Sequence, residues 1–247
     1  MPSNSNARNT FSIQIPTMQN DVLGQALKAY LHGNTADPLI TWTTHTEEDP
    51  MDVGYFFRSF NALPKIEQQA LQHCYGKVLD VGCGAGSHSL YLQDKGHDVT
   101  ALDISPGAIE VSTARGVKHC VEANFFSAPK TQYDTLLFLM NGAGIAQTLN
   151  KLPRFFETLA QYLTPNGQAL LDSSDLSYLF EKEPLPKTPY YGEVEFGVAY
   201  REEQEVFPWL YIDFDTLQAT AKNLGWKCEH LLAGPHYDYL ARLTREY

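Results

Sequence analysis

The chain has 247 residues, of which 43% are hydrophobic and 19% are charged, values typical of one soluble α/β domain with added segments. Its formal net charge is −11 and Lys and Arg form no run, so we expect neither a nucleic acid nor a membrane surface as partner. The four cysteines lack C-x-x-C or metal-ligand spacing, and no signal-peptide pattern or apolar stretch of about 18 residues is present. These features predict a cytoplasmic monomer or homodimer with free thiols and no metal site.

The N-terminal quarter predicts a tail followed by a covering segment. Residues 1–18 are polar and predict a flexible tail. Apolar spacing predicts a helix over 22–31, and Pro64 starts a second helix over 65–74. Between them, residues 33–52 hold two prolines and predict irregular structure.

From residue 65 onward, apolar runs alternate with helical patterns. Strands are predicted over residues 77–81, 98–103, 119–122, 133–140 and 168–172. Helices are predicted over residues 87–95, 106–115 and 152–163. This alternation with short turns predicts a doubly wound, mostly parallel sheet that is covered by helices on both faces.

The alternation ends after residue 173. Residues 174–188 hold two prolines, with a third at position 189, and predict a loop, and the period-two pattern of 192–199 predicts an antiparallel hairpin. A helix is predicted over 213–224, followed by strands over 226–232 and 237–244. The turn between these strands is too short for a crossover helix, so the last of seven strands must run antiparallel.

The predicted organisation is therefore a single domain over 19–247 with two additions to its core. The divisions are an N-terminal helical lid over 19–64, the core over 65–173 and 213–247, and an inserted segment that covers the substrate over 174–212.

A glycine-rich turn follows the first core strand. Asp80 is followed by Gly82, Gly84 and Gly86 at every second position, and the second strand ends in Asp103 about twenty residues later. A strand, a glycine turn, a helix and then an acid form the pattern by which α/β sheets hold an adenosine ribose. A dinucleotide-binding fingerprint would require glycine at position 87, which is serine here.

The G-x-G-x-G turn after Asp-Val resembles motif I of the class I S-adenosylmethionine (SAM)-dependent methyltransferases. The antiparallel last strand also resembles the sheet of that family. The resemblance covers residues 75–247 in outline and is specific in its motifs between 79 and 144. It implies a Rossmann-like methyltransferase fold, SAM as cofactor, and an enzyme that transfers a methyl group to an acceptor.

The resemblance assigns cofactor contacts along the sheet edge. The bare backbone of the glycine turn, with Cys83 packed inside it, would hold the methionine part of SAM, and Asp80 would lie near its amino group. Asp103 would accept the ribose hydroxyls, and Ile104 would lie against the adenine. Asn124 and the backbone N–H of Phe125 would bind the adenine edge, and Asn141 would lie beneath the transferred methyl group.

Each assignment has a structural alternative. Asp103 is suited to capping the helix at Ser105, Asn124 to a plain loop, Asn141 to a turn before Gly142, and Cys83 to packing rather than reaction. A lone cation, Arg58, stands among aromatic residues. It is expected to bind the SAM carboxylate or to pair with one of three acids: Glu47, Glu48 or Asp52.

Two aromatic segments, 20–64 and 173–212, can cover the sheet edge. They predict a lid over a small, partly apolar substrate, with Tyr190 and Tyr191 placed to orient it. The alternative is a minor hydrophobic core beneath the hairpin. The acceptor atom and a catalytic base cannot be read from the sequence. Two other functions stay open: a non-catalytic SAM-binding module, and a nicotinamide-dependent oxidoreductase, which Ser87 and the antiparallel strand disfavour.

Overall fold

The computed structural model describes residues 20–181 and 184–246, and the predicted tail over 1–18 lies outside them. The main sheet has seven strands in the order β10-β11-β7-β6-β3-β4-β5. Its strands are β3 (Lys77–Val81), β4 (Asp98–Asp103), β5 (Cys120–Glu122), β6 (Tyr133–Phe138), β7 (Leu163–Ser174), β10 (Trp226–Ala233) and β11 (Asp238–Arg245).

Strands β3 to β7 pair in parallel, and β11 runs antiparallel to both β7 and β10. The predicted doubly wound sheet with an antiparallel last strand is therefore confirmed. The parallel order follows from the crossovers: a helix follows β3, β4 and β6, and a loop without a helix joins β5 to β6, each returning the chain to the opposite end of the sheet.

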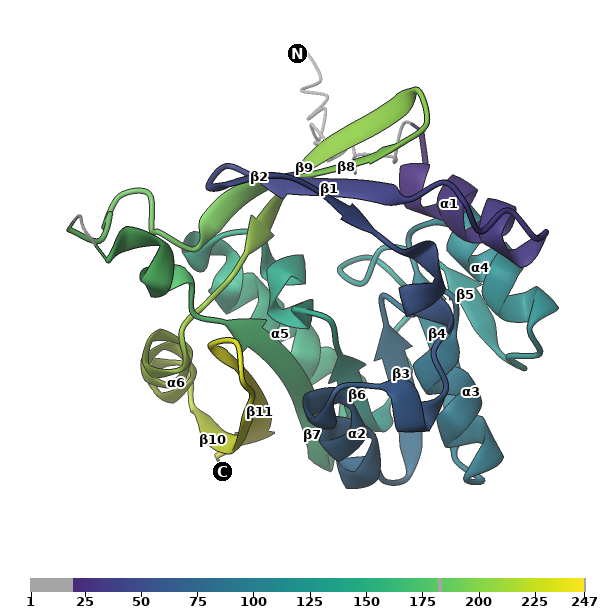
Figure 1. Ribbon diagram of the computed structural model, residues 1–247. Coiled ribbons are helices and arrows are strands. Elements are labelled where there is room, and N and C mark those ends of the chain that lie inside the picture. The colour runs from purple at the N-terminus through teal and green to yellow at the C-terminus, as the bar shows by residue number, and fades with distance from the viewer. Residues whose placement is uncertain (1–19, 182–183, 247) are drawn as a thin grey trace, which may run out of the picture.

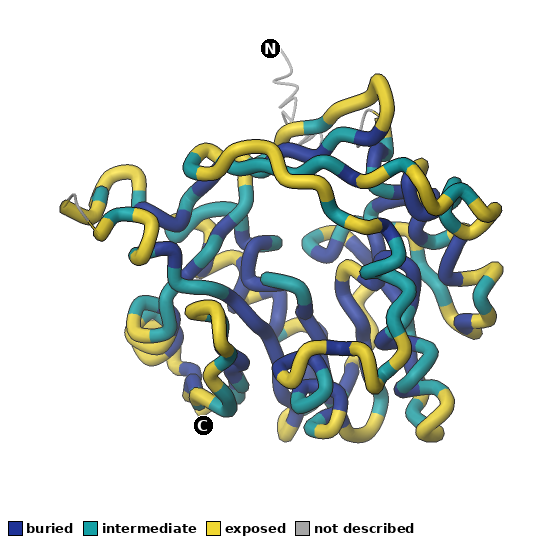
Figure 2. The backbone as a smooth tube through the Cα atoms, in the orientation of Figure 1, coloured by how far each residue is buried: buried dark blue, intermediate teal, exposed yellow. Residues whose placement is uncertain are grey.

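Helices cover both faces of this sheet. They are α2 (Lys65–His73), α3 (Ser87–Asp94), α4 (Pro106–Ala114), α5 (Leu152–Tyr162) and α6 (Phe214–Asn223), whereas α1 (Val22–Leu31) packs on α4. The apolar residues of α5 and α6 pack in one core cluster with one set of strand residues, while α2 and α3 pack with the alternate residues on the other face. Because helices cover both faces of the sheet, β3 and β6 are buried along almost their whole length. Figure 2 shows these buried strands at the centre of the molecule.

A second, antiparallel sheet lies across the main sheet, and we call it the roof sheet. Its strand order is β2-β1-β8-β9, from β1 (Leu39–Thr43), β2 (Thr46–Met51), β8 (Glu193–Tyr200) and β9 (Glu203–Leu210). Figure 1 shows it spanning the end at which the parallel strands of the main sheet terminate. The predicted hairpin is thus part of a four-stranded sheet.

The expectation of irregular structure over 33–52 is wrong, because this stretch contains β1 and β2. Strand β2 has the sequence Thr-Glu-Glu-Asp-Pro-Met, and its acids and proline have low strand propensity. It forms a strand as the exposed edge of the roof sheet, held by pairing with β1, which in turn pairs with β8 across more than 150 residues of chain. The segment predicted as a helical lid therefore also contains a hairpin and is not helical throughout.

Close helix packing fixes the N-terminal segment to the core. A Cβ atom at Gly107 of α4 would lie 2.6 Å from the Cα of Gly24 in α1, so the two helices touch through bare backbone. Asp21 caps α1 by accepting the Gly24 N–H, and it also accepts from the Ser105 hydroxyl and the Gly107 N–H at the start of α4. One carboxylate therefore satisfies the N-termini of two helices.

None of the described helices combines the length and the apolar character that crossing a bilayer would require. All four cysteines are free, and no group of three metal-ligating side chains occurs among the described residues.

Candidate functional site: the carboxyl edge of the sheet

The glycine turn between β3 and α3 is bare backbone that opens to space. Gly82, Gly84 and Gly86 all adopt positive φ, between 53° and 77°, a conformation that favours glycine. A Cβ at Gly82 would meet nothing within 4 Å, whereas one at Gly86 would lie 2.8 Å from the Ser112 hydroxyl. Gly86 is therefore required for packing against α4, and Gly82 borders an open space at the sheet edge.

Asp103 lies at the end of β4 and faces the glycine turn. Its carboxylate accepts the N–H of Gly84 at 2.9 Å and the N–H of Ser105 at 2.9 Å. Burial raises its pKa to about 6, although both backbone hydrogen bonds favour the ionised form. The helix is capped by Ser105, whose hydroxyl accepts the Ala108 N–H, so Asp103 is not the helix cap. A carboxylate offers about four lone-pair positions, so this side chain can still accept further hydroxyl donors.

Asp80 is buried, with 2% of its surface exposed, and accepts the Ser89 hydroxyl at 2.6 Å. Its pKa is raised by burial. Cys83 is also buried, and burial holds the pKa of its thiol well above the ordinary value, so the side chain is an unreactive packing group.

Arg58 pairs with an acid that the sequence did not indicate. Its Nη2 atom donates to both carboxylate oxygens of Glu67 on α2, at 2.9 and 3.1 Å, and its guanidinium lies over the Tyr55 ring. Glu67 also bonds His88 Nε2 at 2.7 Å. The predicted pairing of Arg58 with Glu47 or Glu48 on β2, or with Asp52 before η1 (Val53–Phe57), is therefore wrong. The predicted contact of Arg58 with the SAM carboxylate stays a prediction. Its donor would be Nη1, to which no described residue is hydrogen-bonded.

His88 lies in the first turn of α3, two residues after Gly86, and is buried. Burial alone would lower its pKa, but the hydrogen bond to Glu67 and the negative field of Asp80 outweigh that effect, so the pKa is raised. Arg58, Glu67 and His88 form a buried ionic cluster beneath the turn, with the side chain of Glu67 only 4% exposed.

The loop after β5 places Asn124 and Phe125 beside the same edge. The Asn124 side-chain oxygen accepts the Phe126 N–H at 2.9 Å, an Asx turn that shapes the loop. The Phe125 ring is buried and stacks on Tyr162, so only its backbone can face a ligand. Ile104, after β4, is half-buried, which leaves part of its side chain accessible.

Met140 and Asn141, after β6, both adopt left-handed backbone conformations, with φ of 65° and 58°. Asp172 of β7 holds this turn by accepting the N–H groups of Met140 and Gly142, and burial raises its pKa to about 6. The Asn141 side-chain oxygen accepts the Ser174 hydroxyl at 2.8 Å. The turn is thus fixed by two residues of β7 that sequence reasoning had not placed in the site.

Tyr190 and Tyr191 lie in the inserted segment with their hydroxyls engaged. Tyr190 donates to Asp213 at 2.6 Å, and Tyr191 donates to Asp175 at 2.8 Å. Their pKa values are raised by burial. Tyr191 packs with Leu176 and Val194 in a small cluster, an arrangement that favours the minor-core alternative, and a role in orienting substrate stays a prediction.

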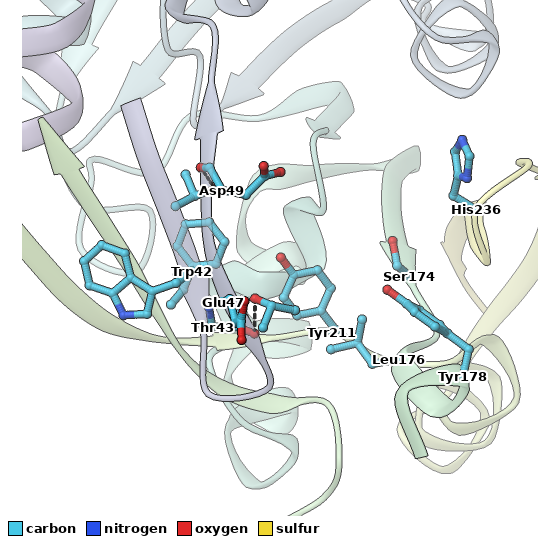
Figure 3. A pocket seen from close by; sticks show the side chains of 12 residues that line it. Trp42, Thr43, Glu47, Asp49, Ser174, Leu176, Tyr178, Tyr211 and His236 are labelled. Carbon is cyan, nitrogen blue, oxygen red and sulfur yellow. Dashed lines mark hydrogen bonds between the residues drawn. The ribbon is translucent and has the colours of Figure 1, made fainter. Parts of the chain in front are cut away.

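A cleft lies between the roof sheet and the main sheet, with a volume of about 270 Å³. Figure 3 shows Trp42, Glu47 and Asp49 on the roof strands, and Ser174, Leu176 and Tyr178 on the opposite wall. Because Ser174 bonds Asn141, this roof cleft adjoins the turn that follows β6.

Comparisons with known proteins place the chain in a family. A family model described as a methyltransferase domain matches residues 55–231. A SAM-dependent methyltransferase from Bacteroides fragilis, solved in complex with S-adenosyl-L-homocysteine, superposes with a TM-score of 0.87 and 43% identity, covering 94% of this chain and 98% of that one. The chain therefore belongs to the class I SAM-dependent methyltransferases, and the cofactor of this family is SAM.

Curated relatives are more distant. The malonyl-[acyl-carrier protein] O-methyltransferase of Pseudescherichia vulneris is 30% identical over 178 residues, covering 67% of this chain and 70% of that protein. A ubiquinone biosynthesis O-methyltransferase of Rickettsia typhi is 28% identical over 109 residues, or 42% of this chain. The matched part spans less than half of that relative's length, 44%.

Proposed function

We propose that this protein transfers a methyl group from SAM to a small-molecule acceptor by in-line displacement. The observation that carries the proposal is the juxtaposition of open backbone at Gly82 with the Asp103 carboxylate, which bonds the same turn through Gly84. The open backbone fits the amino-acid part of SAM, and the carboxylate fits its ribose. The net charge of −11 supports a small acceptor over a nucleic acid.

The chain's own residues supply binding and alignment. The glycine turn and the N-terminus of α3 favour the cofactor carboxylate, and Asp103 accepts the ribose hydroxyls. The Phe125 N–H donates to the adenine edge with Asn124 beside it, and Asn141 holds the polar floor of the reaction site. When bound, SAM supplies a methyl group that its positive sulfur already activates, so the protein needs alignment and a dry site rather than a strong base.

The names of the curated relatives describe methyl transfer to oxygen, which supports transfer to a metabolite without identifying it. The roof sheet supports a lid function, because it closes the sheet edge above the floor formed by Asn141.

Isothermal titration of the purified protein with SAM, S-adenosylhomocysteine (SAH) and NAD tests the cofactor assignment. We expect binding of SAM and SAH and none of NAD. Mass spectrometry of a metabolite extract incubated with methyl-deuterated SAM then tests catalysis. Cofactor binding without label transfer would favour the non-catalytic module, and binding of NAD alone would contradict the proposal.

A further inference from the structure

The roof cleft has the position expected of an acceptor site if the protein is a methyltransferase, so the inference below rests on the proposed function. Its wall residue Ser174 donates to the side chain of Asn141, the polar group assigned to the floor beneath the methyl group. The wall of the cleft is therefore joined directly to that floor by a hydrogen bond of 2.8 Å.

The mouth of the cleft carries uncompensated negative charge. Glu47 and Asp49 line it from β2 and are exposed, and neither forms an ion pair with any residue in the described parts of the chain. None of the cleft-lining residues is Lys or Arg. The chain from residue 33 to 57 contains five acids and no Lys or Arg, so no nearby cation of that segment balances them. A field of this sign attracts cations and opposes carboxylates and phosphates.

The interior of the cleft is aromatic. Phe196 and Tyr211 line it and are half-buried, and burial raises the pKa of Tyr211 to about 12, so its hydroxyl stays neutral. Trp42 borders only the rim, because its indole lies over Gly197 on the face of the roof sheet opposite to Phe196. Rigid aromatic faces attract cations electrostatically and also disfavour charge by desolvation.

We propose that the roof cleft accepts a small amine. The acids at the mouth attract the ammonium form, and the aromatic interior lowers the pKa of the amine so that its proton leaves to water. The unprotonated nitrogen then uses its lone pair to form an N–CH₃ bond while the electron pair of the S–CH₃ bond returns to sulfur. The products are SAH and an N-methylammonium, which releases one further proton to water.

Three probes of similar shape test this inference on the full chain saturated with SAH: phenethylamine, 2-phenylethanol and 3-phenylpropionate. We expect the amine to bind at least ten-fold more tightly than the carboxylate at low salt, as measured by calorimetry or ligand-observed NMR. The double variant Glu47→Gln/Asp49→Asn should reduce this preference to less than three-fold.

Glu48→Gln is the matched control, because Glu48 lies between the two acids on β2 but does not line the cleft. It should keep the preference of the unmodified protein. Equal binding of the three probes, tighter binding of the carboxylate, or an equal loss in Glu48→Gln would overturn the amine assignment. SAH titrated into the unmodified protein separates the two levels: failure to bind SAH contradicts the proposed function, whereas SAH binding without preference among the probes contradicts only this inference.

Discussion

The two halves of the sheet edge are built in different ways. On the β3–β4 side, a glycine turn, a buried carboxylate and a helix N-terminus come from 20 to 30 consecutive residues and bond one another directly. On the β6–β7 side, the space above the edge is closed by strands separated by more than 150 residues of chain. The first half, the proposed cofactor site, is built from neighbouring residues of the chain, whereas the second half is assembled from distant segments.

The largest expected effect comes from removing the ionic contacts that link the two halves. Glu67 comes from α2 and holds Arg58, which leads from the roof, and His88, which follows the glycine turn. Replacing Glu67 by Ala would leave the buried Arg58 guanidinium without its carboxylate and the buried His88 ring without its hydrogen-bond partner, and we expect a loss of about 3–5 kcal/mol in the free energy of unfolding. Urea denaturation monitored by circular dichroism measures this loss.

Glu110→Ala provides the control, since its salt bridge to Lys28 is exposed and should contribute less than about 1 kcal/mol. A Glu67→Ala protein as stable as this control would show that the buried cluster does not hold the halves together.

The next effect concerns the cofactor half alone. Asp103→Ala should weaken SAM binding by about 1.5–3 kcal/mol, because buried hydroxyl donors would lose a charged acceptor. Calorimetry measures the affinity. Glu122→Ala, at the exposed end of the neighbouring strand β5, is the control and should bind SAM normally. Unchanged affinity in Asp103→Ala would make the ribose assignment wrong.

The same division explains what the sequence could predict. The glycine spacing, Asp103 and the alternation of strands and helices are local patterns; they predicted the seven-stranded sheet, which the structure confirms, and a cofactor site at its edge, which stays a prediction. The pairing of β1 with β8 and of Arg58 with Glu67 depends on how distant segments meet, for which no periodic signal exists. Strand β2, with its acids and proline, even carries the opposite signal, and tertiary pairing overrides it.

Asp172 shows a further limit of prediction from the sequence. It stands at the end of a correctly predicted strand, yet only the structure shows that it accepts the N–H groups of Met140 and Gly142. A polar residue at the carboxyl end of a parallel strand was the available signal, since such ends meet at the ligand-binding edge.

A pH series sharpens the assignment of Asp103. Its pKa in the folded protein is raised to about 6, above the ordinary value of 3.8, so ionisation destabilises the ligand-free protein as pH rises through this range. Ribose hydroxyls donate to the ionised carboxylate, so cofactor binding should weaken as pH falls below about 6. We expect SAH affinity to fall roughly ten-fold between about pH 7 and pH 5.

Asp172 also has a pKa of about 6, so it titrates in the same window. Asp103→Asn separates the two groups, because it removes only one of them while keeping a side-chain acceptor. A flat pH profile in this variant assigns the dependence to Asp103, and an unchanged profile would assign it elsewhere.

The smallest expected effect lies on the acceptor side. Tyr190→Phe removes a hydroxyl that donates to Asp213 and accepts its backbone N–H, so the protein should lose about 1 kcal/mol of stability, with turnover changed less than two-fold. Tyr178→Phe, whose exposed hydroxyl forms no hydrogen bond to a described residue, is the matched control for stability. A ten-fold fall in kcat for Tyr190→Phe at unchanged stability would instead support the predicted orienting role. The inserted segment would then contribute directly to the reaction, and the acceptor half would be more than a cover over a locally built cofactor site.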